Sequence, residues 1–345
     1  MTDSKITAAK AQRPIYAGID VGGTNIKFGL VDDNGRVLLE DSIPTESDNG
    51  LPDAIKRMAA QLVKIVADAG LTMDDVAAIG LATPGTMDIA AGMILEPYNL
   101  PAWRNFPIRD ELSKATGKPV TYANDAGAAG FGEYWVGCGA EFGSTVLITL
   151  GTGVGAGIIV GDMSIDGEHS HGAECGHIII DIGDDARACT CGQTGHLEAY
   201  CSATAMVKRA AELMADGAES SLKARVDGGE ELTTLMMAEE ADKGDKLSLQ
   251  LIEEAATYLG VGLVTIAHTI DPSAIVLGGA VNFGGPGTEL GRKFLGWVSA
   301  EFKKRAMPVL ANKTLIDFAR LGGDAGYIGA AGLARISHRK SSGSA

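Results

Sequence analysis

Short alternating hydrophobic runs, separated by turn signals, open the chain. Runs at 15–20 and 26–31 flank a Gly-Gly-Thr-Asn segment at 22–25, and a third run at 36–43 follows an Asp-Asp-Asn-Gly turn at 32–35. Alternation with a period of two is typical of strands, and such glycine-containing segments are typical of the turns between them. The pattern predicts an antiparallel meander with a glycine loop between its first two strands.

The pattern then changes to one in which helices and strands alternate. Hydrophobic residues recur at helical spacing over 52–69, and Gly70 follows as a typical helix end. An apolar run at 76–81 predicts a buried strand, and a strand at 120–123 leads into a helix of small residues at 126–135. A helix between strands indicates a mixed α/β fold.

The second half of the chain repeats the opening arrangement. Strands at 145–150 and 156–160 flank a glycine-threonine segment at 151–155. Two well-separated hairpins of one kind predict two related lobes. The remaining predictions are helices over 202–216, 247–270, 289–305 and 325–336, strands over 274–277 and 315–319, and irregular or short helical structure over 219–246.

Composition narrows the class of protein. The chain has 345 residues, of which 46% are hydrophobic and 21% charged, and this is ordinary for a globular protein with two domains. Its net charge of -15 disfavours a nucleic-acid partner, because such a surface needs clustered Lys and Arg to neutralise phosphates. Backbone N–H groups and a metal ion can still hold the phosphates of a nucleotide.

The sequence shows no segment typical of a membrane-spanning or secreted protein. The most apolar helical candidate, 258–270, is interrupted by Thr265, His268 and Thr269, and the first twelve residues lack an apolar signal core. Five cysteines, an odd number that includes a Cys-x-Cys, favour a metal site in a reducing compartment over a disulfide framework. We therefore expect a cytoplasmic protein without a membrane partner.

Both glycine hairpins carry groups that suit a phosphate. Glycines allow backbone N–H groups to approach an anion, threonine adds a hydroxyl donor, and an acid before the first loop can hold hydrated Mg²⁺. The first loop has neither the Walker pattern nor G-x-G-x-x-G before a helix, and plain hairpin turns are the alternative interpretation. The residues concerned are Asp20, Gly22, Gly23, Thr24, Gly151, Thr152 and Gly153.

Polar or glycine residues also follow other predicted strands, where open α/β sheets bind ligands. Asn124 and Asp125 end one strand, and Asp125 is either the N-cap of the next helix or a general base that accepts a hydroxyl proton. Gly278 and Gly279 follow another strand, where a glycine pair suits an adenine or ribose but equally suits close packing.

The stretch 172–198 is the richest in metal-ligand chemistry. Two thiolates with imidazoles on both flanks are typical of a zinc site. Interleaved carboxylates indicate a metal that shapes a binding pocket rather than one that carries out the reaction. The candidate residues are Glu174, His177, Cys189, Cys191, His196 and Glu198.

In their order along the chain, these segments resemble the ROK family of sugar kinases, within the actin, hexokinase and Hsp70 superfamily. The resemblance extends over roughly 15–335, nearly the whole chain. The matching segments are DVGGTN at 20–25, ATPG at 82–85, NLPAW at 99–103, NDA at 124–126, LGTGVGAG at 150–157, GAECGH at 172–177, CTCGQTGHLE at 189–198 and LGGA at 277–280.

The resemblance implies an α/β fold of two ribonuclease H-like lobes, as in actin-like ATPases, with an active-site cleft between them. The smaller lobe is expected over 1–135, with a C-terminal helix at 322–338 packed back on it. The larger lobe, with the zinc loop, is expected over 136–321. Members of the family are often dimers, so a homodimer is expected.

The resemblance also implies roles for single residues. Asp125 matches the catalytic base, and Asp20 matches the acid associated with the Mg²⁺ of ATP. The implied sugar-binding positions are Gly85, Asn99, Asn124, Asp125, Glu174, His177 and Glu198. The implied ATP-binding positions are Asp20, Gly22, Gly23, Thr24, Gly151, Thr152, Gly153, Gly278 and Gly279.

A structural zinc ion is implied as well, as a brace for the loop that carries Glu198. The family pattern has a third cysteine where this chain has His196, yet two cysteines and two histidines still form a good zinc site. The expected ligands are His177, Cys189, Cys191 and His196. The alternatives to His196 are Cys175, Cys201, His169 and His171.

The function expected from the resemblance is an ATP-dependent hexose kinase of carbohydrate metabolism and glycolysis, foremost a glucokinase that phosphorylates the sugar 6-hydroxyl. An N-acetylhexosamine or N-acetylmannosamine kinase and a fructokinase share its sugar-binding carboxylates. A non-catalytic sugar-responsive regulator is the alternative from another class. It is disfavoured by the negative charge and by a first strand at Ile15, before which no helix-turn-helix fits.

Overall fold

The computed structural model describes residues 5–97 and 100–343, and they form two compact units. Unit 1 comprises 1–144, 157–173 and 320–345, and unit 2 comprises 145–156 and 174–319. This division places 136–144 and 157–173 with the N-terminal residues, whereas the sequence had suggested one boundary near 135. The assignment of lobes 1–135 and 136–321 stays a prediction.

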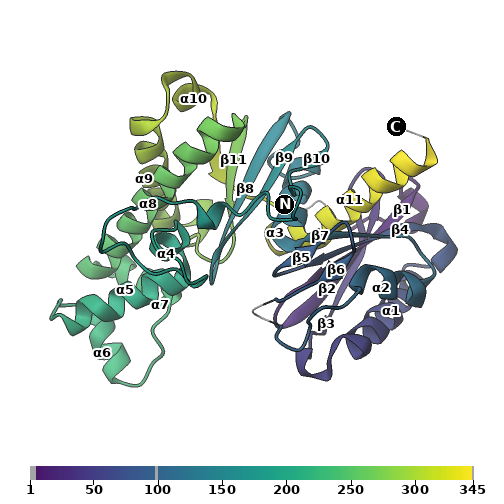
Figure 1. The fold of residues 1–345 in the computed structure, drawn as a ribbon, viewed down its shortest axis with the longest axis horizontal. Helices are drawn as coiled ribbons and strands as arrows, with labels where there is room; N and C mark the ends of the chain where they lie inside the picture. The colour runs from purple at the N-terminus through teal and green to yellow at the C-terminus, as the bar shows by residue number, and fades with distance from the viewer. Residues whose placement is uncertain (1–4, 98–99, 344–345) are drawn as a thin grey trace. The chain divides into compact units, whose positions relative to one another are not determined.

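A five-stranded sheet forms the centre of unit 1 (Figure 1), in the order β3-β2-β1-β4-β7. The predicted meander is confirmed, because β1 (Ile15–Val21), β2 (Asn25–Asp32) and β3 (Val37–Pro44) pair antiparallel. Strands β4 (Val76–Thr83) and β7 (Val120–Asn124) extend the sheet in parallel with β1. The carboxyl ends of β1, β4 and β7 therefore meet at one edge of the sheet.

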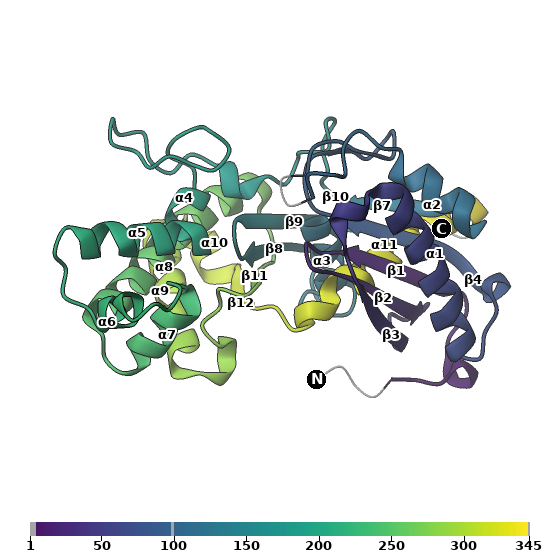
Figure 2. The ribbon, with the colours of Figure 1, turned by 90° about the horizontal axis from the view of Figure 1, so that it is seen from below.

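Helices cover both faces of this sheet (Figure 2). Helices α1 (Leu51–Asp68) and α2 (Ile108–Thr116) pack on one face, with the alternate residues Ile15, Ala17 and Ile19 of β1 in their core. Helix α11 (Ala325–Ser342) packs on the other face beside α3 (Asp125–Trp135). The sequence pattern predicted α1, α3 and α11, and α2 was missed.

Glycines in two strands allow α11 to approach the sheet closely. A Cβ atom at Gly18 would lie 1.8 Å from the backbone oxygen of Tyr327, and one at Gly80 would lie 1.8 Å from that of Ala330. No side chain fits in such a gap, so both positions require glycine. This close packing brings the first residues of α11 to the sheet edge where β1 ends.

The second five-stranded sheet has the order β10-β9-β8-β11-β12. Strands β8 (Ser144–Leu150), β11 (Ala274–Gly278) and β12 (Leu315–Phe318) are parallel neighbours. Strand β9 (Val154–Val160) passes from unit 2 into unit 1 and pairs antiparallel with the short β10 (Met163–Ser164). The second predicted strand–glycine loop–strand unit is thus present.

Helices of unit 2 pack around its longest helix, α8 (Lys246–Ile270). Among the described residues, α8 is the one helix that is long and apolar enough to cross a membrane. Its buried residues, however, pack against α4, α5, α7 and α9, as those of a core helix do. The other helices of unit 2 are α4 (Glu198–Cys201), α5 (Ala203–Ala215), α6 (Ser221–Asp227), α7 (Thr234–Asp242), α9 (Glu289–Arg305) and α10 (Pro308–Lys313).

Short elements complete the described chain. Strands β5 (Met87–Asp88) and β6 (Met93–Ile94) form a separate antiparallel pair. The 3₁₀ turns are Ala8–Lys10, Ser47–Asn49, Met73–Asp75, Cys175–His177, Gly285–Gly287 and Gly322–Asp324.

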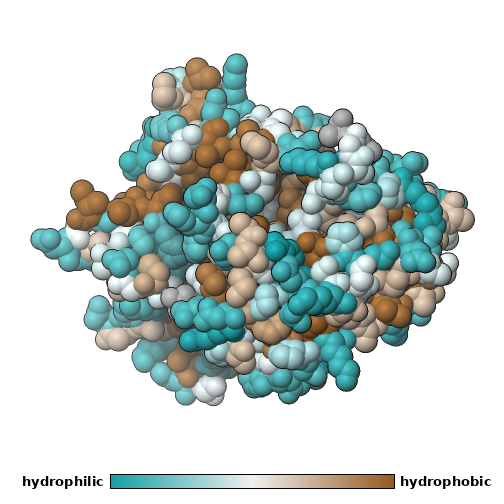
Figure 3. Space-filling model, turned by 45° about the vertical axis from the view of Figure 1, so that its right-hand side comes forward, coloured by the Kyte–Doolittle hydropathy of each residue, from teal (hydrophilic) through white to brown (hydrophobic). Residues whose placement is uncertain are grey.

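Hydrophobic and hydrophilic residues are interspersed on the face of the molecule drawn in Figure 3, with hydrophobic ones most concentrated towards its upper left. The large apolar side chains that are exposed belong to several different elements. They are Val63, Val160, Met163, Ile179, Ile182, Leu235, Met307, Val309 and Leu315.

Candidate active site and metal centre

Two candidate carboxylates lie at the carboxyl edge of the unit 1 sheet. Asp20 is the second-last residue of β1 and pairs in register with Ala82 of β4. Asn124 ends β7 beside Thr83 of β4, and Asp125 follows as the first residue of α3. Because β1, β4 and β7 run parallel, the topology brings together residues that are about a hundred positions apart in the chain.

Asn124, rather than Asp125, is the N-cap of α3. Its side-chain Oδ1 accepts hydrogen bonds from the backbone N–H groups of Ala126 at 2.9 Å and Gly127 at 3.1 Å. The interpretation of Asp125 as a cap is therefore wrong. Asp125 Oδ1 also accepts from the N–H of Ala126 at 2.8 Å, but Asn124 occupies the N-cap position and also holds the N–H of Gly127.

The carboxyl group of Asp20 is largely shielded from solvent. Burial, and after it the negative charge of Asp125, raises the pKa of Asp20 to about 7, and the nearby Lys27 opposes the shift. Helix α11 encloses the same group, since a Cβ atom at Gly326 would lie 2.2 Å from Asp20 Oδ2. A cation next to Asp20 and Asp125 would relieve their repulsion, and carboxylate oxygens are the ligands that Mg²⁺ prefers. The residues thus fit a magnesium ion.

The first glycine loop, between β1 and β2, is braced by a residue that the sequence analysis missed. Thr45 is fully buried, donates from its hydroxyl to the backbone oxygen of Gly22 at 2.7 Å, and donates from its N–H to that of Thr24 at 2.8 Å. A Cβ atom at Gly23 would have no neighbour within 4 Å, so the loop tip is open to a ligand.

The second glycine loop, between β8 and β9, is braced by the start of α5. The backbone oxygen of Gly151 accepts from the N–H of Ala203 at 2.9 Å, and that of Thr152 accepts from the Thr204 hydroxyl at 2.8 Å. Within the loop, the N–H of Gly151 donates to the oxygen of Gly153 at 3.0 Å. The two loops are therefore alike in having their carbonyl groups fixed from outside.

Two further glycine candidates adopt left-handed backbone conformations with close neighbours. Gly85 has φ of 90°, and a Cβ atom there would lie 2.4 Å from Pro97. Gly279, which follows Gly278 at the end of β11, also has φ of 90°, and its Cβ would lie 2.2 Å from the backbone oxygen of Leu150. Close packing is thus present at Gly279, and a ligand contact there stays a prediction. Asn99 lies outside the described residues.

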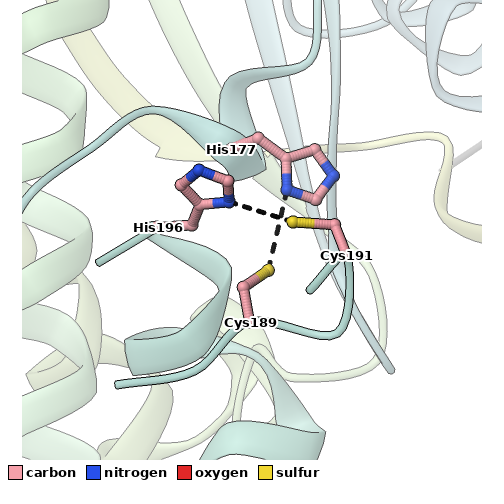
Figure 4. Close-up of side chains that lie close together, drawn as sticks. All are labelled: His177, Cys189, Cys191 and His196. Atoms are coloured by element: carbon pink, nitrogen blue, oxygen red, sulfur yellow. Dashed lines mark hydrogen bonds between the residues drawn. The ribbon is translucent and has the colours of Figure 1, made fainter. Parts of the chain in front are cut away.

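Four side chains of unit 2 converge into a candidate metal centre (Figure 4). The donor atoms of His177, Cys189, Cys191 and His196 all lie within 4.8 Å of one another. Cys189 Sγ lies 3.7 Å from His177 Nδ1, and Cys191 Sγ lies 3.2 Å from His196 Nδ1. Two thiolates and two imidazoles in one cluster are the donor set of a tetrahedral structural zinc. The residues thus fit zinc, and they include His196 rather than its four alternatives.

Backbone hydrogen bonds preform the loop that carries these ligands. The N–H of Ile180 donates to the oxygen of Gly195 at 2.9 Å, and the N–H of Leu197 donates to that of Ile178 at 3.0 Å. The N–H of Cys189 donates to the oxygen of Gln193 at 2.8 Å, which closes a small hairpin around Cys191. His177 and His196 are thereby brought side by side although nineteen positions separate them in the chain.

The two glutamates of this stretch differ in their surroundings. Glu174 is half exposed, and its Oε2 lies 3.8 Å from Nε2 of His177. Glu198 is buried at the start of α4, where its Oε2 accepts from the N–H of Val154 at 2.9 Å and its Oε1 accepts from the Thr190 hydroxyl at 2.6 Å. Glu198 therefore connects the metal-binding loop to the second glycine loop.

Comparison with known proteins decides the family. A family model described as the ROK family matches residues 16–336 of the chain. The chain belongs to the ROK family. The glucokinase of Halalkalibacterium halodurans is 34% identical to this ROK protein over 320 residues, which cover 93% of this chain and 94% of that one.

Two solved ROK structures resemble the protein over nearly its whole length. The ROK hexokinase from Thermus thermophilus has a TM-score of 0.80 and 30% identity, and the match covers 94% of this chain and 99% of that one. A ROK family glucokinase from Streptomyces griseus, solved in complex with glucose and AMPPNP, has a TM-score of 0.72 and 33% identity, with 93% and 99% covered. The family and the α/β class expected from the sequence are confirmed.

The ROK protein also contains supporting residues for which the sequence offered no signal. Thr45 and Thr204 are ordinary threonines in sequence, and Gly326 is one of many glycines in a small-residue helix. Each acts through a contact with a residue distant in the chain, which no local pattern encodes. Glycine loops leave backbone groups that need hydrogen-bond partners, so some hydroxyl-bearing residue was to be expected near each loop. The sequence does not say which one.

Proposed function

We propose that this ROK protein is an ATP-dependent glucokinase, which transfers the γ-phosphoryl group of ATP to the 6-hydroxyl of glucose. The observation that carries the proposal is the pair Asp20 and Asp125 at one sheet edge, with the cap of α3 supplied by Asn124. The similarity to glucokinases over nearly the whole chain supports glucose as the sugar.

In the proposed reaction, the carboxylate of Asp125 accepts the proton of the sugar 6-hydroxyl. The hydroxyl oxygen then forms a bond to the γ-phosphorus while the bond between that phosphorus and the β,γ-bridging oxygen of ATP breaks. The products are glucose 6-phosphate, ADP and one proton. Such transfers depend mainly on alignment and charge neutralisation, so a placed base and fixed phosphate contacts are sufficient protein chemistry.

The proposed ATP site uses backbone N–H groups of the two glycine loops. The carbonyl groups of both loops are already fixed by Thr45, Ala203 and Thr204, so the loops are rigid before a phosphate arrives. Asp20 would hold hydrated Mg²⁺, which neutralises phosphate charge when bound. The proposed ATP-binding residues remain Asp20, Gly22, Gly23, Thr24, Gly151, Thr152, Gly153, Gly278 and Gly279.

The proposed sugar contacts come from carboxylates, amides and an imidazole, which can donate to and accept from several hydroxyl groups. They are Asn124, Asp125, Glu174, His177 and Glu198, with Gly85 lining the site and Asn99 assigned by resemblance alone. Zinc on the four-residue cluster would supply structural bracing and no chemistry. We further propose that the protein is a homodimer, as the resemblance to the family implies. We also propose a reducing cytoplasmic location, in keeping with five cysteines free of disulfides.

A panel of sugars and phosphoryl donors tests the proposal. Purified protein is assayed with glucose, N-acetylglucosamine, N-acetylmannosamine, mannose and fructose, each with ATP and with polyphosphate. Glucose with ATP should give the highest kcat/KM. A higher value for an N-acetylhexosamine or for fructose would replace glucose as the substrate, and phosphorylation of none of these sugars would favour a non-catalytic sugar-responsive regulator.

A further inference from the structure

Thr190 stands between two of the candidate metal ligands, Cys189 and Cys191. Neither the expected site nor the zinc cluster includes it. Its hydroxyl points to Glu198, and the distance from Thr190 Oγ1 to Glu198 Oε1 is 2.6 Å. A short hydrogen bond from a hydroxyl to a carboxylate is of the strong, charge-assisted kind.

Glu198 is held through both of its carboxylate oxygens. Oε1 accepts from Thr190, and Oε2 accepts from the backbone N–H of Val154 in the second glycine loop at 2.9 Å. The glycine loop leaves no freedom on that side, because a Cβ atom at Gly153 would lie 2.4 Å from Oε2. Cys189 Sγ also lies 3.6 Å from Oε1. A carboxylate has about four acceptor positions, so about one remains for a ligand hydroxyl.

We propose that Thr190 is a positioning residue for the sugar site: its hydroxyl fixes the Glu198 carboxylate, and thereby couples the metal-binding loop to sugar affinity. This inference rests on the proposed function, in which Glu198 contacts the sugar. The candidate ligands Cys189 and Cys191 on either side would anchor the backbone of Thr190 next to Glu198, within reach of this hydrogen bond.

The surroundings of Thr190 allow the hydroxyl to be removed without disturbing the fold. The residue is exposed, and together with Glu198 it lines a cavity of about 730 Å³ in unit 2. Valine has nearly the same shape as threonine but no hydroxyl, and serine keeps the hydroxyl without the methyl group. Thr190→Val and Thr190→Ser are therefore a matched pair that separates the hydrogen bond from packing.

The test measures glucose binding and turnover in the full chain. Glucose dissociation constants are measured by calorimetry without nucleotide, together with KM for glucose, KM for ATP, kcat and zinc content. We expect Thr190→Val to weaken glucose binding and raise the glucose KM about five- to tenfold, the size of effect that loss of a typical hydrogen bond has. Thr190→Ser should stay within about twofold of the wild type, with ATP KM and zinc content unchanged in both variants.

Three outcomes would overturn the inference. Thr190→Val binds glucose as the wild type does, or Thr190→Ser binds it as weakly as Thr190→Val, or Thr190→Val loses zinc and recovers full affinity when zinc is added. In each case the wild type is active on glucose, so the proposed function stands. A wild type that neither binds nor phosphorylates glucose would instead refute the proposed function, and the role of Thr190 with it.

Discussion

Asp125 is the residue on which the proposed chemistry depends most. Replacement by asparagine keeps the shape of the side chain and the start of α3, which Asn124 caps, but removes the proton acceptor. We expect Asp125→Asn to lower kcat about 10²- to 10⁴-fold, the usual contribution of a general base. Steady-state kinetics with glucose and ATP measure the loss.

A first-turn aspartate on another helix of unit 1 offers the matched control for this prediction. Asp110 lies in the first turn of α2, exposed and paired with Arg109. Asp110→Asn should keep kcat within about twofold, as surface substitutions do. If Asp125→Asn retains wild-type turnover while binding glucose normally, Asp125 is not the base.

For single residues, the sequence predicted the candidate catalytic and binding residues better than the residues that hold them in position. Asp125 follows a strand and precedes a helix, and that local pattern predicted a site. Whether Asp125 or Asn124 capped the helix depended on side-chain geometry, which the pattern does not encode. The role of Thr45 arises from a contact with a segment 23 positions earlier, and that of Thr190 from the fold of the loop between it and Glu198, so no local pattern revealed them.

Among the elements, α9 contains two glycines with opposite surroundings. A Cβ atom at the exposed Gly296 would meet nothing within 4 Å, whereas one at Gly291 would lie 2.1 Å from the backbone oxygen of Gly285. Gly296→Ala should raise the free energy of unfolding by about 0.5–1 kcal/mol, because alanine loses less backbone entropy in a helix. Gly291→Ala should lower it by about 1–3 kcal/mol through overpacking.

Urea denaturation of the two alanine variants beside the wild type checks this pair. The midpoints should move in opposite directions, with the same slope in all three proteins. Equal shifts of the two variants would contradict the packing described for α9.

Helices α6 and α7 are joined by an ionic cluster around Glu240. Its carboxylate accepts from Lys243 Nζ at 2.7 Å, from the Ser221 hydroxyl at 2.5 Å and from Arg225 Nη1 at 3.2 Å. Hydrogen bonding to Lys243, then to Ser221 and Arg225, lowers the pKa of Glu240 to about 2. A carboxylate with a lowered folded-state pKa stabilises the fold above its unfolded pKa of 4.5 and loses that contribution as the pH falls towards 2.

The expected result is a free energy of unfolding that falls between about pH 4.5 and pH 2.5 more steeply in the wild type than in Glu240→Gln. Unfolding curves at several pH values measure it. Glu219→Gln is the control, because Glu219 is an exposed glutamate near the same helices. A Glu240→Gln variant with the wild-type pH dependence would exclude this cluster as the source.

The metal-binding loop carries the four candidate zinc ligands His177, Cys189, Cys191 and His196. We expect one zinc ion per chain, retained in His196→Cys and lost on dilution in His196→Ala, since removal of one of four ligands weakens the site. Elemental analysis after dialysis measures the zinc, and thermal unfolding should begin earlier in the metal-depleted protein. Metal-free protein with full activity and unchanged thermal unfolding would contradict a structural zinc.

Element prediction succeeded where hydrophobic periodicity was long and clear. Helix α9 has the predicted bounds, and α8 begins one residue earlier than expected. Helices α2 and α10 were not predicted, because they are short and have few buried residues to mark a face. The backbone conformation of the metal-binding loop was not predicted either, because its hydrogen bonds join residues that show no hydrophobic pattern.

For the whole molecule, the repeated strand–glycine loop–strand pattern predicted two related lobes, and the described chain has two five-stranded sheets, each with such a loop. The division of residues between the units is less regular than the expected lobes, since β9 passes from one unit to the other and α11 returns to the first sheet. A chain that crosses between units several times cannot be divided by composition alone, because no linker marks the crossings.

The joint consumption of glucose and ATP is the central property of the proposed kinase, and a single assay measures it. Purified wild-type protein is mixed with glucose, ATP and Mg²⁺, and the formation of ADP and glucose 6-phosphate is followed together. We expect equal amounts of both products, with ADP formation negligible when glucose is omitted, because the sugar hydroxyl is the phosphoryl acceptor. ADP formation without glucose 6-phosphate, or no turnover of either substrate, would contradict the proposed function.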